Sequence, residues 1–198
     1  SGENEEGDNK DEGENDGEGE SGKEDEEVEV IPEWTSEYFN VPEVSQDGWI
    51  RITRPEEMAA FLISGQPAGA RLMIVSDLDM SLMPEDVVSA VAASSRSFTE
   101  LTVEGSGCTI SNYSSNAFFN SSQSLQISNL AFENFVISAD SQGAGVLVNE
   151  LRGNAAFHNV AVRNSTVSAA SADAGAIVGS IARMNPEDRQ EELSVSFE

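Results

Sequence analysis

One 26-residue pattern occurs twice in this chain, and its two copies start thirty residues apart. Residues 127–152 align with residues 157–182 without a gap, and seven pairs beyond the identical ones keep apolar character. Nine pairs are identical: Asn129/Asn159, Ala131/Ala161, Asn134/Asn164, Ser138/Ser168, Ala139/Ala169, Ser141/Ser171, Ala144/Ala174, Gly145/Gly175 and Val148/Val178. A fixed period of this length is typical of a solenoid, in which each repeat covers only the apolar face of its neighbours.

Each copy contains short apolar runs separated by Asn, Ser and Gly, with no room for a helix of useful length. Strands of about three to five residues are not stable alone or as a single hairpin. They become stable when the chain winds so that equivalent strands pair in parallel, about 4.8 Å apart. Leu130 would then lie over Val160, and Asn129 over Asn159. We therefore predict a mainly β fold, a right-handed parallel β-helix, with an antiparallel β-sandwich as the alternative.

Shorter copies of the pattern flank the two full ones. Residues 109–113 resemble residues 126–130, and residues 117–120 resemble residues 145–149. Residues 193–197 alternate between apolar and polar again near the end of the sequence. We therefore count two complete coils and two partial ones, and we assign residues 101–198 to coils with a repeat of about thirty residues.

The preceding region, residues 34–100, has a different sequence pattern, which includes helices. Helical patterns cover residues 55–63 and 84–93, and Thr53 stands where the first helix needs an N-cap. The open end of a wound sheet exposes unpaired strand edges, which must be covered. We therefore predict that residues 34–100 form an α/β region whose short helices cap the coils.

The first 33 residues hold sixteen of the 36 acidic residues and two of the ten basic ones. Such a segment cannot bury enough apolar surface to offset the entropy of ordering, so we predict a disordered acidic tether over residues 1–33. Residues 8–13 come nearest to a calcium loop, but Lys10 occupies a ligand position there. So acidic a chain cannot neutralise phosphates, which excludes nucleic acid as a partner.

The cysteine count and the hydropathy pattern bear on disulfide bonds and on membrane spans. Cys108 is the only cysteine, so an intramolecular disulfide is excluded, and we expect a small buried apolar side chain there. No run of about 18 apolar residues is present, which predicts no transmembrane segment. No secretory signal is visible. We expect a monomer.

The sequence marks no catalytic, cofactor-binding or metal-binding residue clearly. His158 is the only histidine and takes the position of Ser128 in the first copy. The period of two places it on the outer surface, and no nucleophile or orienting acid is marked by spacing. With one His and one Cys, only an all-oxygen metal site is possible. We therefore predict no catalytic residue, no cofactor and no metal.

Two weaker candidates remain open. Asp77 and Asp79 lie two residues apart at the end of a predicted strand, and therefore on one face. Paired carboxylates can act as acid and base on a glycosidic bond, but they can equally cap turns or accept backbone hydrogen bonds. Trp34, Tyr38 and Phe39 form a dense aromatic cluster. They would either stack on sugar rings or plug the apolar end of the first coil.

Several short motifs resemble those of bacterial surface proteins with GLUG-type repeats. The coil motifs are Gln126-Ile127-Ser128-Asn129-Leu130, Gly145-Val146-Leu147-Val148 and Ala174-Gly175-Ala176-Ile177-Val178-Gly179. The opening of the family resembles residues 50–53, 56–61 and 77–80. This chain departs from the pattern at Asn149, which replaces a closing glycine, and in its helix at 84–93. The resemblance implies an adhesin-like β-helix on a Gram-negative cell surface, as an outer-membrane lipoprotein or a secreted protein. Any lipid anchor would precede Ser1.

We therefore predict a non-enzymatic cell-surface β-helix domain that binds a glycan or a protein through a flat face rich in Asn, Ser and Thr. The alternative is a carbohydrate-active β-helix enzyme, a glycoside hydrolase or a lyase, that uses Asp77 and Asp79. A structural spacer without a ligand is the second alternative.

Overall fold

The computed structural model describes residues 33–65, 67–139, 143–170, 173–181 and 195–197. The predicted acidic tether lies outside the described residues except for Glu33. The polar segment at 184–192, which precedes the last predicted strand, lies outside them as well.

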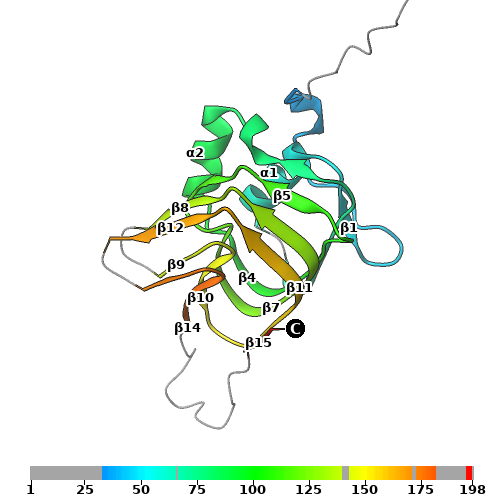
Figure 1. Ribbon diagram of the computed structural model, residues 1–198. Coiled ribbons are helices and arrows are strands. Elements are labelled where there is room, and N and C mark those ends of the chain that lie inside the picture. The colour runs from blue at the N-terminus through cyan, green and yellow to red at the C-terminus, as the bar shows by residue number, and fades with distance from the viewer. Residues whose placement is uncertain (1–32, 66, 140–142, 171–172, 182–194, 198) are drawn as a thin grey trace, which may run out of the picture. The chain divides into compact units, whose positions relative to one another are not determined.

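The described part of the chain is mainly β, as predicted (Figure 1). Its helices are α1 (Pro55–Ser64) and α2 (Glu85–Ala93), with short 3-10 turns η1 (Ser36–Tyr38) and η2 (Met80–Leu82). Its strands are β1 (Ile50–Ile52), β2 (Ala70–Ile74), β3 (Leu78–Asp79), β4 (Ser97–Glu104), β5 (Thr109–Ser111), β6 (Ser114–Ser115), β7 (Phe119–Glu133), β8 (Val136–Ala139), β9 (Ala144–Gly145), β10 (Val148–Leu151), β11 (Ala155–Arg163), β12 (Thr166–Ala169), β13 (Ala174–Gly175), β14 (Val178–Ile181) and β15 (Val195–Phe197).

Every strand pairing within the described residues is parallel. One curled sheet has the strand path β1-β2-β4-β7-β10-β14, and β3, β5, β11 and β15 join it off this path. Two smaller sheets, β6-β8-β12 and β9-β13, lie beside it. The antiparallel sandwich is therefore the wrong alternative, because adjacent strands come from successive windings of the chain rather than from hairpins.

The thirty-residue repeat is the stacking unit, as predicted. Val148 pairs with Val178, Phe157 with Ile127, and β12 with β8 over its whole length. The partial copy at 117–120 also stacks as expected, because Phe119 pairs with Val148.

The predicted register of the other partial copy is wrong. Residues 109–111 pair with residues 131–133 instead of 126–130. The reason is local: Asn112, like Asn134, has a positive φ, and the two turn residues are aligned in successive layers.

Parallel register lines up like residues into apolar columns. One column contains Ile50, Leu72, Val103, Ile127 and Phe157, all of them at most 3 % exposed. A second apolar group is aromatic and comprises Tyr113, Phe118, Phe132 and Phe135, with ring centroids 5.2–6.1 Å apart. Both groups belong to one continuous core, which fixes the register because a slip of one residue would turn every inward side chain outward.

Helix α1 begins two residues after the predicted N-cap. Pro55 is the first helical residue, and the Glu57 carboxylate accepts hydrogen bonds from the backbone N–H groups of Thr53 (2.7 Å) and Arg54 (3.2 Å). The carboxylate of the third helical residue thus satisfies the backbone at the helix start, where the sequence pointed to the Thr53 hydroxyl. The apolar face of α1 meets the sheet through Phe61, whose ring stacks on Phe98 at 5.6 Å.

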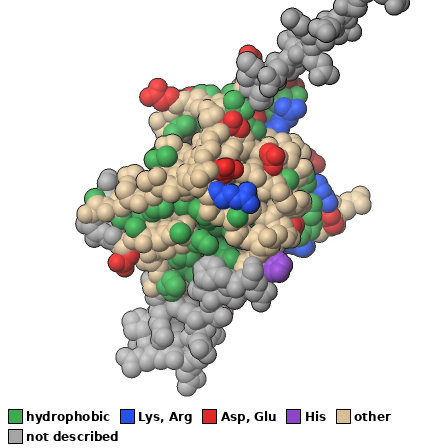
Figure 2. All heavy atoms as spheres, viewed as in Figure 1, with side chains coloured by type: hydrophobic (Ala, Val, Ile, Leu, Met, Phe, Trp, Pro, Cys, Tyr) green, Lys and Arg blue, Asp and Glu red, His purple; other side chains and the backbone are tan. Residues whose placement is uncertain are grey.

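Burial falls off in the layer that contains β11, β12 and β14. Leu151 is fully buried, but its partner in the next layer, Ile181, is 54 % exposed. Val160 and Val167 are likewise only partly buried, in contrast to Leu130 beneath Val160. Figure 2 shows apolar side chains gathered on the viewed face, over the region where Figure 1 places β9, β12 and β14. The helices lie together at the opposite end of this view.

The aromatic group gives a direct test of the packing. Phe132→Ala should lower the free energy of unfolding by about 3–5 kcal/mol, because it removes a buried ring with two aromatic neighbours. Val136→Ala, at a nearby side chain that is 53 % exposed, should change it by no more than about 0.5 kcal/mol. Urea unfolding followed by circular dichroism measures both, and equal losses would contradict the packing described.

Candidate functional site: a polar groove across three strands

Two asparagine ladders run along the stack, and each ends at a carboxylate. In the first, Asn159 Nδ2 donates to Asn129 Oδ1 (3.1 Å), and Asn129 Nδ2 donates to Glu104 Oε1 (3.0 Å). Asn129 and Asn159 both have positive φ, a conformation that Asn tolerates better than other side chains. The prediction that these two residues lie one above the other is confirmed.

The second ladder explains one of the candidate acids. Asn134 Nδ2 donates to Asn112 Oδ1 (3.0 Å), and Asn112 Nδ2 donates to Asp79 Oδ1 (3.0 Å). Asp79 also accepts from the Ser81 backbone N–H and hydroxyl. Burial alone would raise the pKa of Asp79, but these hydrogen bonds hold its pKa below the ordinary value.

Asp77 is exposed and accepts a hydrogen bond from the Thr109 backbone N–H at 2.8 Å. Both candidate acids therefore bind groups that belong to the layer above them, which is the plainer of the two interpretations of the pair. Neither carboxylate lines the groove described below.

The remaining candidates lie apart from one another. His158 is exposed and pairs in register with Ser128, as predicted. Cys108 is only partly buried, and burial raises the pKa of its thiol. Trp34 packs partly against the core, with Phe39 at 5.7 Å. Tyr38 lies under the Arg54 guanidinium, 4.0 Å from the ring centroid.

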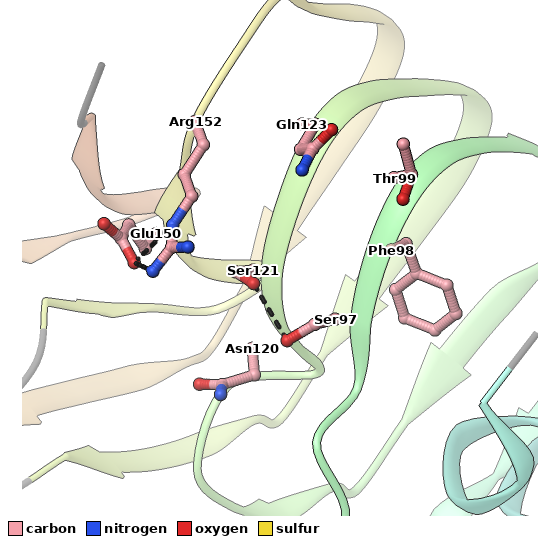
Figure 3. A pocket seen from close by; sticks show the side chains of 8 residues that line it. All are labelled: Ser97, Phe98, Thr99, Asn120, Ser121, Gln123, Glu150 and Arg152. Atoms are coloured by element: carbon pink, nitrogen blue, oxygen red, sulfur yellow. Dashed lines mark hydrogen bonds and ion pairs between the residues drawn. The ribbon is translucent and has the colours of Figure 1, made fainter. Parts of the chain in front are cut away.

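A polar groove of about 220 Å³ opens where β4, β7 and β10 lie side by side (Figure 3). Three successive strands each contribute outward-facing side chains to it. Its lining residues are Ser97, Phe98, Thr99, Asn120, Ser121, Gln123, Glu150 and Arg152.

Register produces this arrangement. Ser121 pairs with Ser97 on one side and with Glu150 on the other, so these three side chains form one outward column along the stack. Gln123 and Arg152 follow two residues later on the same face. Hydroxyl, amide and charged groups thus repeat at the strand spacing of about 4.8 Å.

The chain segments of β7 and β10 approach each other closely beside the groove. Ser122 turns inward, is 1 % exposed, and donates its hydroxyl hydrogen to the Ser124 carbonyl (2.9 Å). Gly153 passes so near the chain that an added Cβ would meet the Gln123 carbonyl oxygen at 1.7 Å. No other residue fits there without moving the backbone, so Gly153 sets the distance between the two layers at the groove.

Hydrogen bonds hold part of the lining in place. Ser121 Oγ donates to Ser97 Oγ (2.9 Å), and Arg152 donates from Nε (3.0 Å) and from a terminal nitrogen (2.7 Å) to one oxygen of Glu150. Figure 3 shows the last two side chains turned toward each other at one side of the groove. The hydrogen bonds to Glu150 raise the pKa of Arg152, so this guanidinium stays protonated, and its formal charge is opposite to that of the carboxylate beside it.

This lining combines neutral polar side chains with one ion pair. It offers donors and acceptors for several hydroxyl groups, and its net charge is zero. Glu150 is the only carboxylate among the eight described lining residues, and its partner is Arg152. A hydrolysis by paired carboxylates has no second acid at this place.

The sequence patterns pointed to a face rich in Asn, Ser and Thr but missed this groove. The available signal is the motif polar-x-polar, which occurs at Ser97-Phe98-Thr99, Ser121-Ser122-Gln123 and Glu150-Leu151-Arg152. The three motifs are unequally spaced along the chain, so only the pairing register brings them together.

No family model, curated protein or solved structure matches this chain. Within the described residues, no helix has the length and apolar character required to cross a membrane.

The first ladder predicts a pH-dependent contribution to stability. Burial would raise the pKa of Glu104, but hydrogen bonds from Ser128, the Ser106 backbone and Asn129 hold it below the usual 4.5. A carboxylate whose pKa is lowered by folding stabilises the fold above its unfolded pKa, and the contribution disappears as pH falls through the folded value.

We therefore expect Glu104→Gln to lower Tm at pH 7, and the difference from wild type to shrink as pH falls below about 4.5. Glu100→Gln, on the same strand but with an exposed side chain, is the matched control and should leave Tm nearly unchanged. Differential scanning calorimetry between pH 3 and 7 measures both. A Tm difference for Glu104→Gln that is constant with pH would contradict the role of the ionised carboxylate.

Proposed function

We propose that this chain is the binding part of a cell-surface protein, folded as a right-handed parallel β-helix, and that its polar groove binds an uncharged, hydroxyl-rich glycan without turning it over. The β-helix is supported by the parallel pairing of equivalent strands and by the thirty-residue register. The surface location, as a lipid-anchored or secreted protein of a Gram-negative bacterium, is supported by the resemblance to GLUG-type repeats.

One observation carries the binding proposal: polar side chains from three successive strands line one groove. A glycan chain presents hydroxyl groups at short, regular intervals, and the columns of the groove present hydroxyl, amide and ionic partners at the strand spacing. The Glu150–Arg152 pair supplies one charged acceptor and one charged donor, which make stronger hydrogen bonds to hydroxyl groups than neutral partners do. Its cancelled charge favours a neutral glycan over an acidic one.

A non-catalytic role is favoured by the use of the two candidate acids. Asp77 and Asp79 accept hydrogen bonds from Thr109 and Asn112, which keeps the two carboxylates engaged within the stack. A glycoside hydrolase or lyase remains the competing proposal, and a spacer without a ligand is the other.

Glycan-array binding by the full chain, combined with mass spectrometry of the same oligosaccharides after long incubation, separates these proposals. Retention of neutral glycans without shortened products supports binding. Release of shorter products would favour the enzyme, and the absence of binding would favour the spacer. Selective capture of a protein instead of a glycan would also overturn the proposal.

The groove itself is tested by Arg152→Ala. This change removes a charged donor and leaves the Glu150 carboxylate unpaired, so affinity for a retained neutral glycan should fall by about tenfold or more. Arg163→Ala, an exposed arginine on β11 outside the groove, is the matched control and should bind like wild type. Isothermal titration calorimetry gives both constants, and equal affinities would remove the groove as the binding site.

A further inference from the structure

We propose that one side of the groove can only accept hydrogen bonds from a ligand, so that the site requires free hydroxyl groups that donate and discriminates against the same glycan with those groups capped. This side consists of Ser97, Ser121 and Glu150, which lie in register and which we call the acceptor column. The inference rests on the proposed glycan binding and names the ligand groups that the site recognises.

A short relay of hydrogen bonds uses the hydrogen atoms of both serine hydroxyl groups. The Ser95 carbonyl oxygen can only accept, so Ser97 Oγ is the donor in the hydrogen bond that joins them (3.1 Å). The single hydroxyl hydrogen of Ser97 is then occupied, and Ser121 Oγ must donate to Ser97 Oγ (2.9 Å). Neither hydroxyl group has a hydrogen left for a ligand, but each oxygen keeps a lone pair that can accept.

Glu150 completes the column with the same property. Its carboxylate accepts two hydrogen bonds from Arg152 on one oxygen and has no hydrogen to donate. The next layer repeats the scheme outside the groove, because Ser180 pairs with Glu150 and donates its hydroxyl hydrogen to the Asn149 carbonyl (3.2 Å). The hydroxyl hydrogens along this line of the stack are thus used inside the protein.

The opposite side of the groove can donate. Figure 3 shows Thr99, Gln123 and Arg152 in a second row beside the acceptor column. Arg152 donates to Glu150 through Nε and one terminal nitrogen, which leaves its other terminal nitrogen for a ligand. Within the described residues, the side chains of Thr99 and Gln123 have no hydrogen-bond partner. A donor is therefore available on this side in each of the three strands.

The two unlike sides have a chemical consequence for the ligand. A sugar hydroxyl group that lies between them donates to the acceptor column and accepts from the opposite side at the same time. A fluorine atom or an ester oxygen at the same place only accepts, so it would face the oxygens of the acceptor column with no hydrogen between them. The hydrogen bond is then lost, and the facing oxygens leave water without a partner. The site therefore discriminates by the hydrogen of the ligand hydroxyl group and not by its oxygen.

Cellotriose and its analogues with one hydroxyl group replaced by hydrogen or by fluorine test this directly, because fluorine is close in size to a hydroxyl group but cannot donate. At the hydroxyl groups that face the acceptor column, both replacements should lower the affinity of the full chain by the same factor, about tenfold. Isothermal titration calorimetry measures each constant. Fluorine analogues that bind within about twofold of cellotriose at every position would overturn the proposal.

Ser121→Ala identifies the protein partner of one ligand hydroxyl group. The variant should bind cellotriose about three- to tenfold more weakly. It should bind the analogue that lacks the hydroxyl group facing Ser121 as well as wild type does, because the same interaction is already missing there. Ser124→Ala, on the same strand but outside the groove, is the matched control and should leave every affinity unchanged. An equal further loss of affinity with every analogue would overturn the assignment of Ser121 as an acceptor.

A third measurement needs no sugar, which separates failure of this inference from failure of glycan binding. Neutron diffraction from crystals of the deuterated free protein locates the hydroxyl deuterium atoms. One should lie between Ser121 Oγ and Ser97 Oγ, bonded to Ser121, and the other between Ser97 Oγ and the Ser95 carbonyl oxygen. The reverse direction, from Ser97 to Ser121, would overturn the relay even if a glycan binds. The expected direction, with no binding of cellotriose, would leave the relay in place and overturn its role in recognition.

Discussion

Parallel pairing of equivalent strands in successive layers is the constraint on which the rest of this protein depends. Strands as short as β9 and β13 have two residues each and cannot persist alone. They persist because each layer supplies the hydrogen-bond partners and the apolar surface that the next one lacks. The same register that builds the apolar columns inside also aligns polar side chains outside. The groove is therefore a by-product of the stacking and does not require an additional loop.

Polar groups at the turns are satisfied along the stack in the same manner. Asn129 and Asn112 each accept from the asparagine of the layer above and donate to the layer below, so the amide NH₂ group at the end of each ladder needs an acceptor. Glu104 and Asp79 occupy these ends, where a carboxylate accepts several hydrogen bonds at once. An acid at these places is explained by the acceptor that the ladder requires.

Sequence periodicity predicted the mainly β character, the thirty-residue stacking unit and the neighbours Asn129 and Asn159, because a repeat without gaps aligns equivalent residues of paired strands. It failed for residues 109–113, because their sequence resembles residues 126–130 while residues 109–111 pair with residues 131–133. The left-handed turn at Asn112 decides that alignment. Nothing in the sequence distinguishes this asparagine from the others. The groove was missed for a related reason, since its three motifs come from windings of unequal length.

Arg96 shows a second limit of sequence reasoning. Its side chain is 2 % exposed, and it donates to the Tyr113 hydroxyl and to the Ala117 carbonyl, while its Nε has no partner in the described structure. Burial lowers the pKa of this guanidinium. No periodic pattern predicts a cation in an apolar interior, because its position is decided by the packing of several segments that are distant in the chain.

The partly exposed layer of β11, β12 and β14 has a consequence for how the molecule unfolds. Each winding touches only its neighbours, so the resistance of a layer to opening depends on how well both of its faces are covered. The layer that contains Val160 and Ile181 has less apolar contact than the layer that contains Leu130 and Leu151. We therefore expect this layer to open before the layers beneath it, and the strands covered by the helices to open last.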